Sequence, residues 1–147
     1  MSAEDPGAGH RSVDLERVSR GHYRLRNERG GCLVIGDGSG EEFTPVELLL
    51  AAIAGCSSVD VDLITSRRAE PEEFTVLASG EKASEPGKGN HMTDIEVTFR
   101  VRFPEGEGGD AAREAFPRSV AQSRDRLCTV SRTVQLGTPV QMSAEDL

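Results

Sequence analysis

The chain has 147 residues, a length that fits one ordinary domain and can bury a core without metal or disulfide staples. A formal net charge of −8, with no run of Lys or Arg, argues against nucleic acid and anionic membranes as partners. The first residues are polar and acidic, and we interpret no stretch as long enough for a membrane span, so we expect a cytoplasmic protein.

Three cysteines lie far apart in the sequence: Cys32, Cys56 and Cys128. They form no CxxC pair, and the three histidines do not fall at metal-ligand spacing from them or from each other. We therefore expect no metal and no other cofactor. The odd and sparse cysteine count also argues against a disulfide scaffold, although a transient catalytic disulfide stays open.

Both ends of the chain are polar, so residues 1–12 predict a disordered lead and residues 143–147 a frayed tail, neither of which should carry function. Between them, residues 13–142 are expected to form a single domain. Its first part contains short apolar runs separated by Gly, Ser and Asn. This pattern predicts a meander of three strands over residues 13–18, 22–26 and 32–36.

A helix is predicted from Thr44 to about residue 68. Thr44 can serve as N-cap, Pro45 suits the first helical position, and Glu47 completes a capping box. The following residues are apolar nearly all round, which predicts a buried central helix. One stripe along this helix, which we expect to be a packing seam, consists of Leu49, Ala52 or Ile53, Cys56, Val59 and Leu63. The simplest interpretation of Cys56 is a residue that fills this seam.

Two strands are predicted after the helix, over residues 74–80 and 94–103, with a turn at 87–90 that joins them into an antiparallel hairpin. The second strand alternates strictly and places five apolar residues on one face: Ile95, Val97, Phe99, Val101 and Phe103. The hairpin should therefore have one wet face and one packed face.

A second helix is predicted over residues 108–127, kinked or split in two by Pro117. Cys128 follows at its end, and residues 132–142 predict one or two edge strands. The whole order of elements predicts an α+β fold with helices packed on antiparallel sheets. If the two helices pack side by side, Cys56 and Cys128 come within the Cα separation of roughly 7 Å that a disulfide needs.

Two segments together resemble the paired signature of the OsmC/Ohr family, the osmotically inducible and organic hydroperoxide resistance proteins. They are PVELLLAAIAGCSSVDV at 45–61 and CTVSRTV at 128–134, and the resemblance extends over about 13–142. It implies an intertwined homodimer with sites at the subunit interface. It also implies a thiol-dependent peroxidase for organic hydroperoxides, in which Cys56 attacks the peroxide, Cys128 resolves the sulfenic acid, and a dithiol reductant restores both thiols.

The resemblance further implies an Arg from the N-terminal strands and a Glu near the start of the central helix. We choose Arg24, with His22, Arg20 and Arg26 nearby. The family's Glu position is Val46 here, and Glu47 comes one residue later, a departure that resembles the OsmC-like branch more than the classical peroxidases. Nine helical residues span about 13.5 Å and end half a turn out of phase, so Glu47 reaches Cys56 only across a dimer interface. Its alternative role is the capping box.

Other polar residues have simpler interpretations. Hydrogen-bonding roles are favoured for Ser57, Ser58 and Ser131 because no nucleophile elbow accompanies them. Asp60 and Asp62 are expected to be solvated helix charges rather than an acid–base pair, and Cys32 a small core residue. The alternative function is a non-enzymatic OsmC-like stress-response or binding protein that keeps the thiol pair and takes a small apolar or thiol-reactive ligand.

Overall fold

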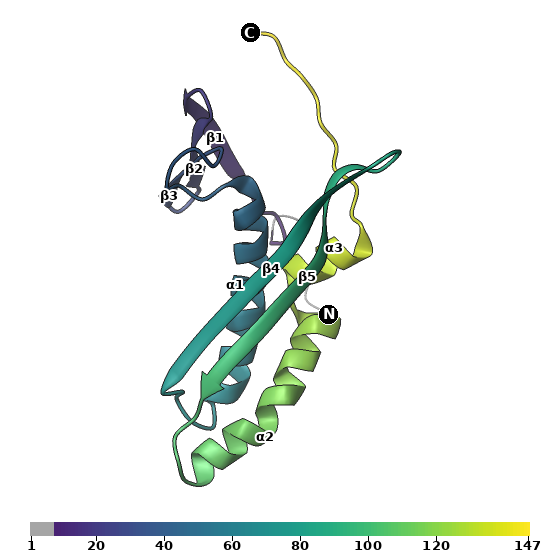
Figure 1. The fold of residues 1–147 in the computed structure, drawn as a ribbon. Helices are drawn as coiled ribbons and strands as arrows, with labels where there is room; N and C mark the ends of the chain where they lie inside the picture. Colours follow the sequence, from purple (N-terminus) through teal and green to yellow (C-terminus); the bar gives the residue numbers. More distant parts are fainter. Residues whose placement is uncertain (1–7) are drawn as a thin grey trace. The chain divides into compact units, whose positions relative to one another are not determined.

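The structure, a computed structural model, describes residues 8–147, so the first seven residues of the predicted lead lie outside the described residues. Two compact units divide after Leu48. The strands are β1 (Val13–Ser19), β2 (His22–Asn27), β3 (Cys32–Ile35), β4 (Glu73–Glu85) and β5 (Gly89–Arg102). The helices are α1 (Pro45–Ser66), α2 (Glu107–Gln122), the π-helix η1 (Ser123–Leu127) and α3 (Thr129–Leu136) (Figure 1).

The N-terminal unit contains the predicted meander, an antiparallel sheet in the order β1-β2-β3. Leu25 of the central strand lies opposite Leu15 on one side and Leu33 on the other, so the register aligns apolar residues across the sheet. The turn between β2 and β3 is held by the Asn27 side chain. Cys32, expected in the core, is instead exposed, because it begins a short edge strand.

The capping box at the start of α1 is confirmed. The backbone N–H of Thr44 donates to the Glu47 carboxylate at 2.9 Å, and the N–H of Glu47 donates to the Thr44 hydroxyl at 3.3 Å. These reciprocal bonds satisfy amides that a helix N-terminus leaves without partners. At the other end, Arg68 donates to the carbonyl of Ile64 at 2.9 Å, close to the predicted end of the helix.

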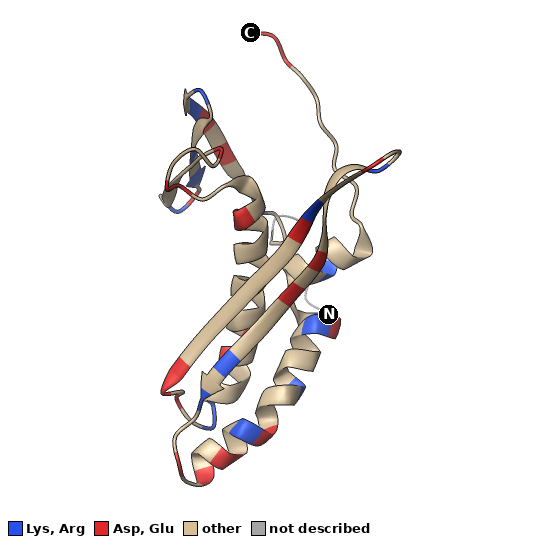
Figure 2. Cartoon of the chain, viewed as in Figure 1, with Lys and Arg blue, Asp and Glu red and all other residues tan. Residues whose placement is uncertain are grey.

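The buried face of α1 differs from the predicted seam. The buried residues follow a spacing of four and are Ile53, Ser57, Val61 and Thr65. Two residues of the predicted seam, Val59 and Leu63, are 66% and 57% exposed. A helix that is apolar nearly all round has several equivalent stripes, so hydrophobic spacing alone does not select the buried one. Figure 2 shows how few charges interrupt this helix.

The length and composition of α1 also correct an expectation about membranes. Its 22 residues are long and apolar enough to cross a membrane by length and composition. The expectation that no stretch reaches that length was therefore wrong. Core helices of soluble proteins can be equally long and apolar, so length and composition alone do not distinguish a core helix from a membrane-spanning helix.

Strands β4 and β5 form the predicted hairpin, which is several residues longer at its turn end than the sequence pattern indicated. Ala78 pairs with Val97 near the middle, and burial alternates along both strands as predicted. Phe74 and Phe99 meet edge to face with ring centroids 6.2 Å apart. The half-buried face of β5 carries four of the five predicted apolar residues, and the fifth, Phe103, is buried just beyond the end of the strand.

The segment after the hairpin corrects two predictions. Of the two effects predicted for Pro117, the split does not occur, since α2 continues through it to Gln122, and η1 begins at Ser123. Residues 132–136, predicted as strand, belong to α3, and no regular structure follows over 138–147. The β-branched residues suggested a strand, but a cap at Cys128 and a left-handed Gly137 enclose one short helix.

Candidate functional site

The fold brings two of the predicted site residues together. Cys56 lies in the middle of α1, and Cys128 lies between η1 and α3, close enough for the two thiols to influence each other. Both cysteines are free, Cys56 half-buried and Cys128 fully buried. Of the two, only Cys56 therefore has an exposed part that a dissolved molecule can reach.

The sulfur of Cys128 accepts hydrogen bonds from two donors. The residue is the N-cap of α3, and its sulfur accepts from the backbone N–H of Ser131 at 3.4 Å. On the other side, the hydroxyl of Ser57 from α1 donates to the same sulfur, also at 3.4 Å. The sulfur is thus an acceptor in both contacts, which fix its position between α1 and α3.

The surroundings of Cys56 act on its thiol in opposite directions. Burial raises the pKa of Cys56 above its ordinary value, and the adjacent Cys128 thiol raises it further. The backbone N–H groups of Val130 and Thr129, in the first turn of α3, lower it. The net direction is upward. Cys56 lies far from the N-terminus of its own helix, and it is the N-terminus of α3, from another part of the chain, that reaches its sulfur.

A second set of hydrogen bonds joins α1 to the segment that carries Cys128. The hydroxyl of Ser123, the first residue of η1, donates to the carboxylate of Asp60 at 2.9 Å. The carbonyl of Ser123 accepts the backbone N–H of Cys128 at 3.0 Å. Asp60 was expected to be a solvated charge, but it lies one helical turn from Cys56 and bonds a residue that is buried. The predicted hydrogen-bonding roles of the Ser57, Ser58 and Ser131 hydroxyls are confirmed, the last as an acceptor from the Gln135 side chain at 2.8 Å.

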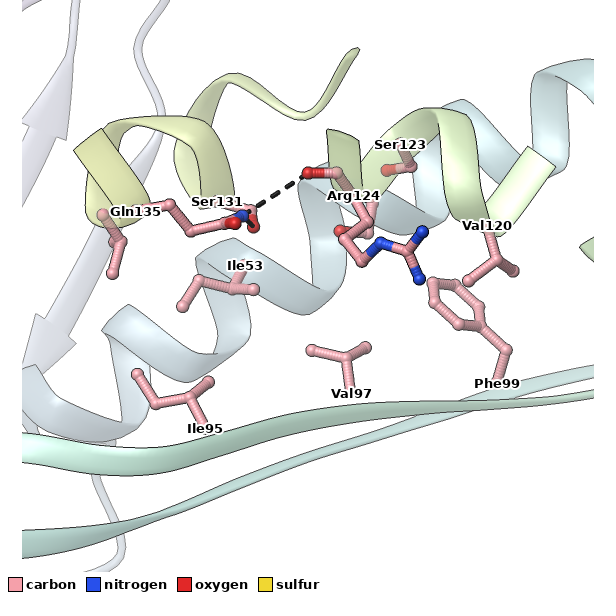
Figure 3. A pocket seen from close by; sticks show the side chains of 11 residues that line it. Ile53, Ile95, Val97, Phe99, Val120, Ser123, Arg124, Ser131 and Gln135 are labelled. Carbon is pink, nitrogen blue, oxygen red and sulfur yellow. Dashed lines mark hydrogen bonds between the residues drawn. The ribbon is translucent and has the colours of Figure 1, made fainter. Parts of the chain in front are cut away.

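A cavity of about 470 Å³, whose lining side chains are drawn in Figure 3, adjoins the residues that contact the Cys128 sulfur. Its apolar lining consists of Ile53, Ile95, Val97, Phe99, Val120 and Val134, and its polar lining of Ser57, Ser123, Arg124, Ser131 and Gln135. Ser57 and Ser131 thus contact both the cavity and the sulfur of Cys128. Neither Cys56 nor Cys128 belongs to this lining.

The other two predicted site residues belong to the N-terminal unit. Arg24 is half-buried on β2, where it pairs with Glu16 in the strand register, while the Glu16 carboxylate bonds Arg26 at 3.2 Å. Glu47 forms the capping box, and the Thr44 amide lowers the pKa of its carboxyl. The contacts of Glu47 are therefore those of a capping residue.

The sequence matches the protein family described as OsmC-like protein over residues 36–143, which include both cysteines of the site. The chain belongs to the OsmC-like family. The family match confirms the resemblance drawn from the two cysteine motifs. No curated protein matches the sequence.

Solved structures share the fold of this OsmC-like chain. A hypothetical protein from Aquifex aeolicus is 23% identical, with 88% of this chain and 89% of that chain covered and a TM-score of 0.69. An OsmC-like protein of unknown function from Vibrio cholerae is 13% identical, with coverages of 86% and 94% and a TM-score of 0.71. An organic hydroperoxide resistance protein OsmC from Legionella pneumophila is 14% identical, with coverages of 87% and 90% and a TM-score of 0.56.

Proposed function

We propose that this OsmC-like protein is a thiol-dependent peroxidase that reduces organic hydroperoxides in oxidative-stress defence. The observation that carries the proposal is the asymmetric thiol pair, in which half-buried Cys56 adjoins fully buried Cys128. An attacking thiol must meet a dissolved peroxide, whereas a resolving thiol needs only to meet the first thiol. The Legionella pneumophila neighbour, named for organic hydroperoxide resistance, adds support at the level of the fold.

The proposed reaction balances with these two thiols and one external reductant. The Cys56 thiolate attacks one peroxide oxygen, the O–O bond breaks, and an alcohol leaves with the proton that the thiol lost. Cys128 then displaces the hydroxyl of the Cys56 sulfenic acid as water and forms a disulfide. A dithiol reductant reopens the disulfide by exchange. We place the reaction in the cytoplasm, where such reductants act.

The thiolate needs help because burial raises the pKa of Cys56. We propose that Arg24 supplies a cation and Glu47 a carboxylate to orient it, within a homodimer. The exposed apolar residues Val59 and Leu63 on α1 support dimer formation, since a partner would cover them. Light scattering tests the assembly, and a mass of 15.8 kDa at every concentration would contradict the dimer.

Peroxide consumption tests the reaction. Wild-type protein, tert-butyl hydroperoxide and dithiothreitol should consume peroxide faster than the uncatalysed mixture, and one equivalent of peroxide without reductant should remove two thiols. Peptide mapping should then find a Cys56–Cys128 link. Arg24→Ala should slow peroxide consumption. Arg26→Ala is the control and should not, because the Arg26 side chain pairs with Glu16. Folded wild type with both thiols still free after peroxide would contradict the proposal.

A specific observation favours a second candidate, a non-enzymatic OsmC-like protein that binds a small apolar ligand. The cavity that adjoins the residues in contact with the Cys128 sulfur is mostly apolar, and neither Cys56 nor Cys128 lines it. Its volume of about 470 Å³ falls in the range of small-molecule sites. Fluorescence titration with an environment-sensitive apolar dye, with Val97→Arg as the cavity-blocking variant, would detect such binding. Dye binding together with uncatalysed peroxide consumption would favour this candidate.

A further inference from the structure

One face of α1 holds the segment that carries Cys128. Ser57 and Asp60 are three residues apart and so share a face of the helix. Ser57 donates to the Cys128 sulfur at 3.4 Å, and Asp60 accepts from Ser123 at 2.9 Å. The side chains of Ser57 and Ser123 belong to residues only 7% and 1% exposed. The Ser57 contact is therefore buried and the Ser123–Asp60 contact partly buried, and this shielding from water strengthens them.

The Ser57 contact acts on the chemistry of the sulfur. Attack on another sulfur requires the sulfur to face its target, and the sulfur of the fully enclosed Cys128 is held in place by hydrogen bonds from the protein. The Ser131 amide supplies one from the backbone, and the Ser57 hydroxyl supplies the other from a side chain. Together they also fix the direction in which the sulfur faces.

The Asp60 contact acts on the backbone. Asp60 fixes the hydroxyl of Ser123, and the carbonyl of Ser123 accepts the N–H of Cys128 at 3.0 Å. The carboxylate therefore anchors the π-helical turn from which Cys128 projects. It does so from a position one helical turn beyond Cys56, so the same helix places one thiol and anchors the other.

We propose that Ser57 and Asp60 are positioning residues for disulfide closure, Ser57 through the Cys128 sulfur and Asp60 through Ser123. The proposal rests on the proposed role of Cys128 as resolving thiol. In the step concerned, the Cys128 sulfur forms a bond to the Cys56 sulfur as the S–O bond of the sulfenic acid breaks. The hydroxide that leaves takes up the proton that Cys128 lost and departs as water.

Closure can be measured without peroxide in a Cys32→Ser background. The aromatic disulfide 5,5′-dithiobis(2-nitrobenzoate) first forms a mixed disulfide on Cys56. Attack by Cys128 then makes the Cys56–Cys128 bond and releases a second coloured thiolate, whose appearance gives the closure rate. Ser57→Ala should slow this release about tenfold because a hydrogen bond to a charged group is lost. Ser57→Thr, which keeps the hydroxyl, should stay within about threefold of the parent rate.

Ser58→Ala is the matched control, since the Ser58 hydroxyl donates to the Ala54 carbonyl of its own helix at 2.6 Å. Asp60 has a similar series. Asp60→Ala should slow closure about tenfold, whereas Asp60→Asn keeps an acceptor for Ser123 and should stay within about threefold. Asp62→Ala removes an exposed carboxylate two residues away and should change nothing.

Closure by Ser57→Ala at the parent rate, or equal slowing by Ser58→Ala, would overturn the role of Ser57. Equal rates for Asp60→Ala and Asp62→Ala would overturn that of Asp60. Circular dichroism checks that each variant folds. If Ser57→Ala is unfolded, the closure rates of Ser57→Thr and of the Asp60 variants test the proposal instead. Peroxide consumption is measured on the same proteins. A parent that closes with the expected dependence but consumes no peroxide overturns the proposed function and leaves this inference standing.

Discussion

The two thiols of the pair occupy contrasting surroundings. Cys56 lies on an apolar helix, is half-buried, and has a pKa that burial raises. Cys128 is fully buried, yet its sulfur receives hydrogen bonds from Ser57 and from the Ser131 amide. Cys56 is therefore the thiol that a dissolved molecule can reach, and Cys128 is the thiol that hydrogen bonds hold in place. The contrast suits a reaction in which the accessible thiol meets the substrate and the enclosed thiol completes the cycle.

The contrast also separates what each cysteine needs from the rest of the protein. Cys128 is served by neighbours within the C-terminal unit, from α1, η1 and α3. Cys56 receives the α3 amides, which do not outweigh burial. A peroxidatic Cys56 thus requires a further positive group, for which Arg24 is the proposal. Replacing each thiol in turn tests this division.

The largest effect is expected from Cys56→Ser. Catalysed peroxide consumption should fall to the uncatalysed rate, because a serine hydroxyl supplies almost no oxyanion near neutral pH. A coupled peroxide assay with dithiothreitol measures this loss. If Cys56→Ser keeps activity while Cys128→Ser loses the first attack, the roles of the two thiols are reversed.

A smaller and different loss is expected from Cys128→Ser. The first attack should proceed at the wild-type rate, and Cys56 should accumulate as a sulfenic acid that excess peroxide oxidises to sulfinic acid. Mass spectrometry of the intact protein, with a dimedone trap for the sulfenic acid, follows both products. Wild type should give the disulfide instead. Loss of the first attack in this variant would contradict the proposed resolving role.

The pH dependence sharpens the comparison further. Because the folded-state pKa of Cys56 is raised, the folded state holds its proton to higher pH than the unfolded state. This contribution to the free energy of unfolding is fully present below the unfolded pKa of about 8.5 and is lost as pH rises through the folded pKa. Urea unfolding between pH 7 and about 10 should show this decline, with a shallower slope in Cys56→Ser. Equal slopes would mean that a cation cancels the effect of burial.

The smallest effect is expected from Cys32→Ser. Cys32 is exposed at the start of an edge strand, so the change in free energy of unfolding should stay within about 0.5 kcal/mol. Both the first attack and disulfide closure should keep their wild-type rates. Urea unfolding and the coupled assay check these points, and a clear loss of either rate would bring a third thiol into the reaction.

Local signals in the sequence predicted much of this fold. Thr44, Pro45 and Glu47 identified the start of α1 because a capping box is formed by residues close together in the chain. The strict alternation of apolar and polar residues in β5 likewise identified its packed face and its exposed face. The buried stripe of α1 was missed because an apolar helix has no unique face, and α3 was missed because its caps outweigh the β-branched residues between them.

The candidate site was predicted less completely. The sequence identified both thiols through their motifs, but the contacts around them join residues 63 and 71 positions apart, which no local pattern reports. Ser57 and Asp60 were visible only as polar residues in an apolar helix. That interruption was the available signal, since a buried polar side chain needs a partner and its presence in such a helix indicates a tertiary contact.

The π-helical turn η1 has a consequence for the spacing of the chain. Its hydrogen bond from Cys128 to Ser123 spans five residues, one more than an α-helical bond. Each helical residue turns the chain by about 100°, so deleting one residue from η1 would return the turn to α-helical register and rotate the sulfur of Cys128 away from α1. The number of residues between α2 and the second thiol is therefore fixed more tightly than the identity of the exposed residues in η1. This protein should tolerate a substitution in η1 such as Asp125→Asn far better than the deletion of one residue there.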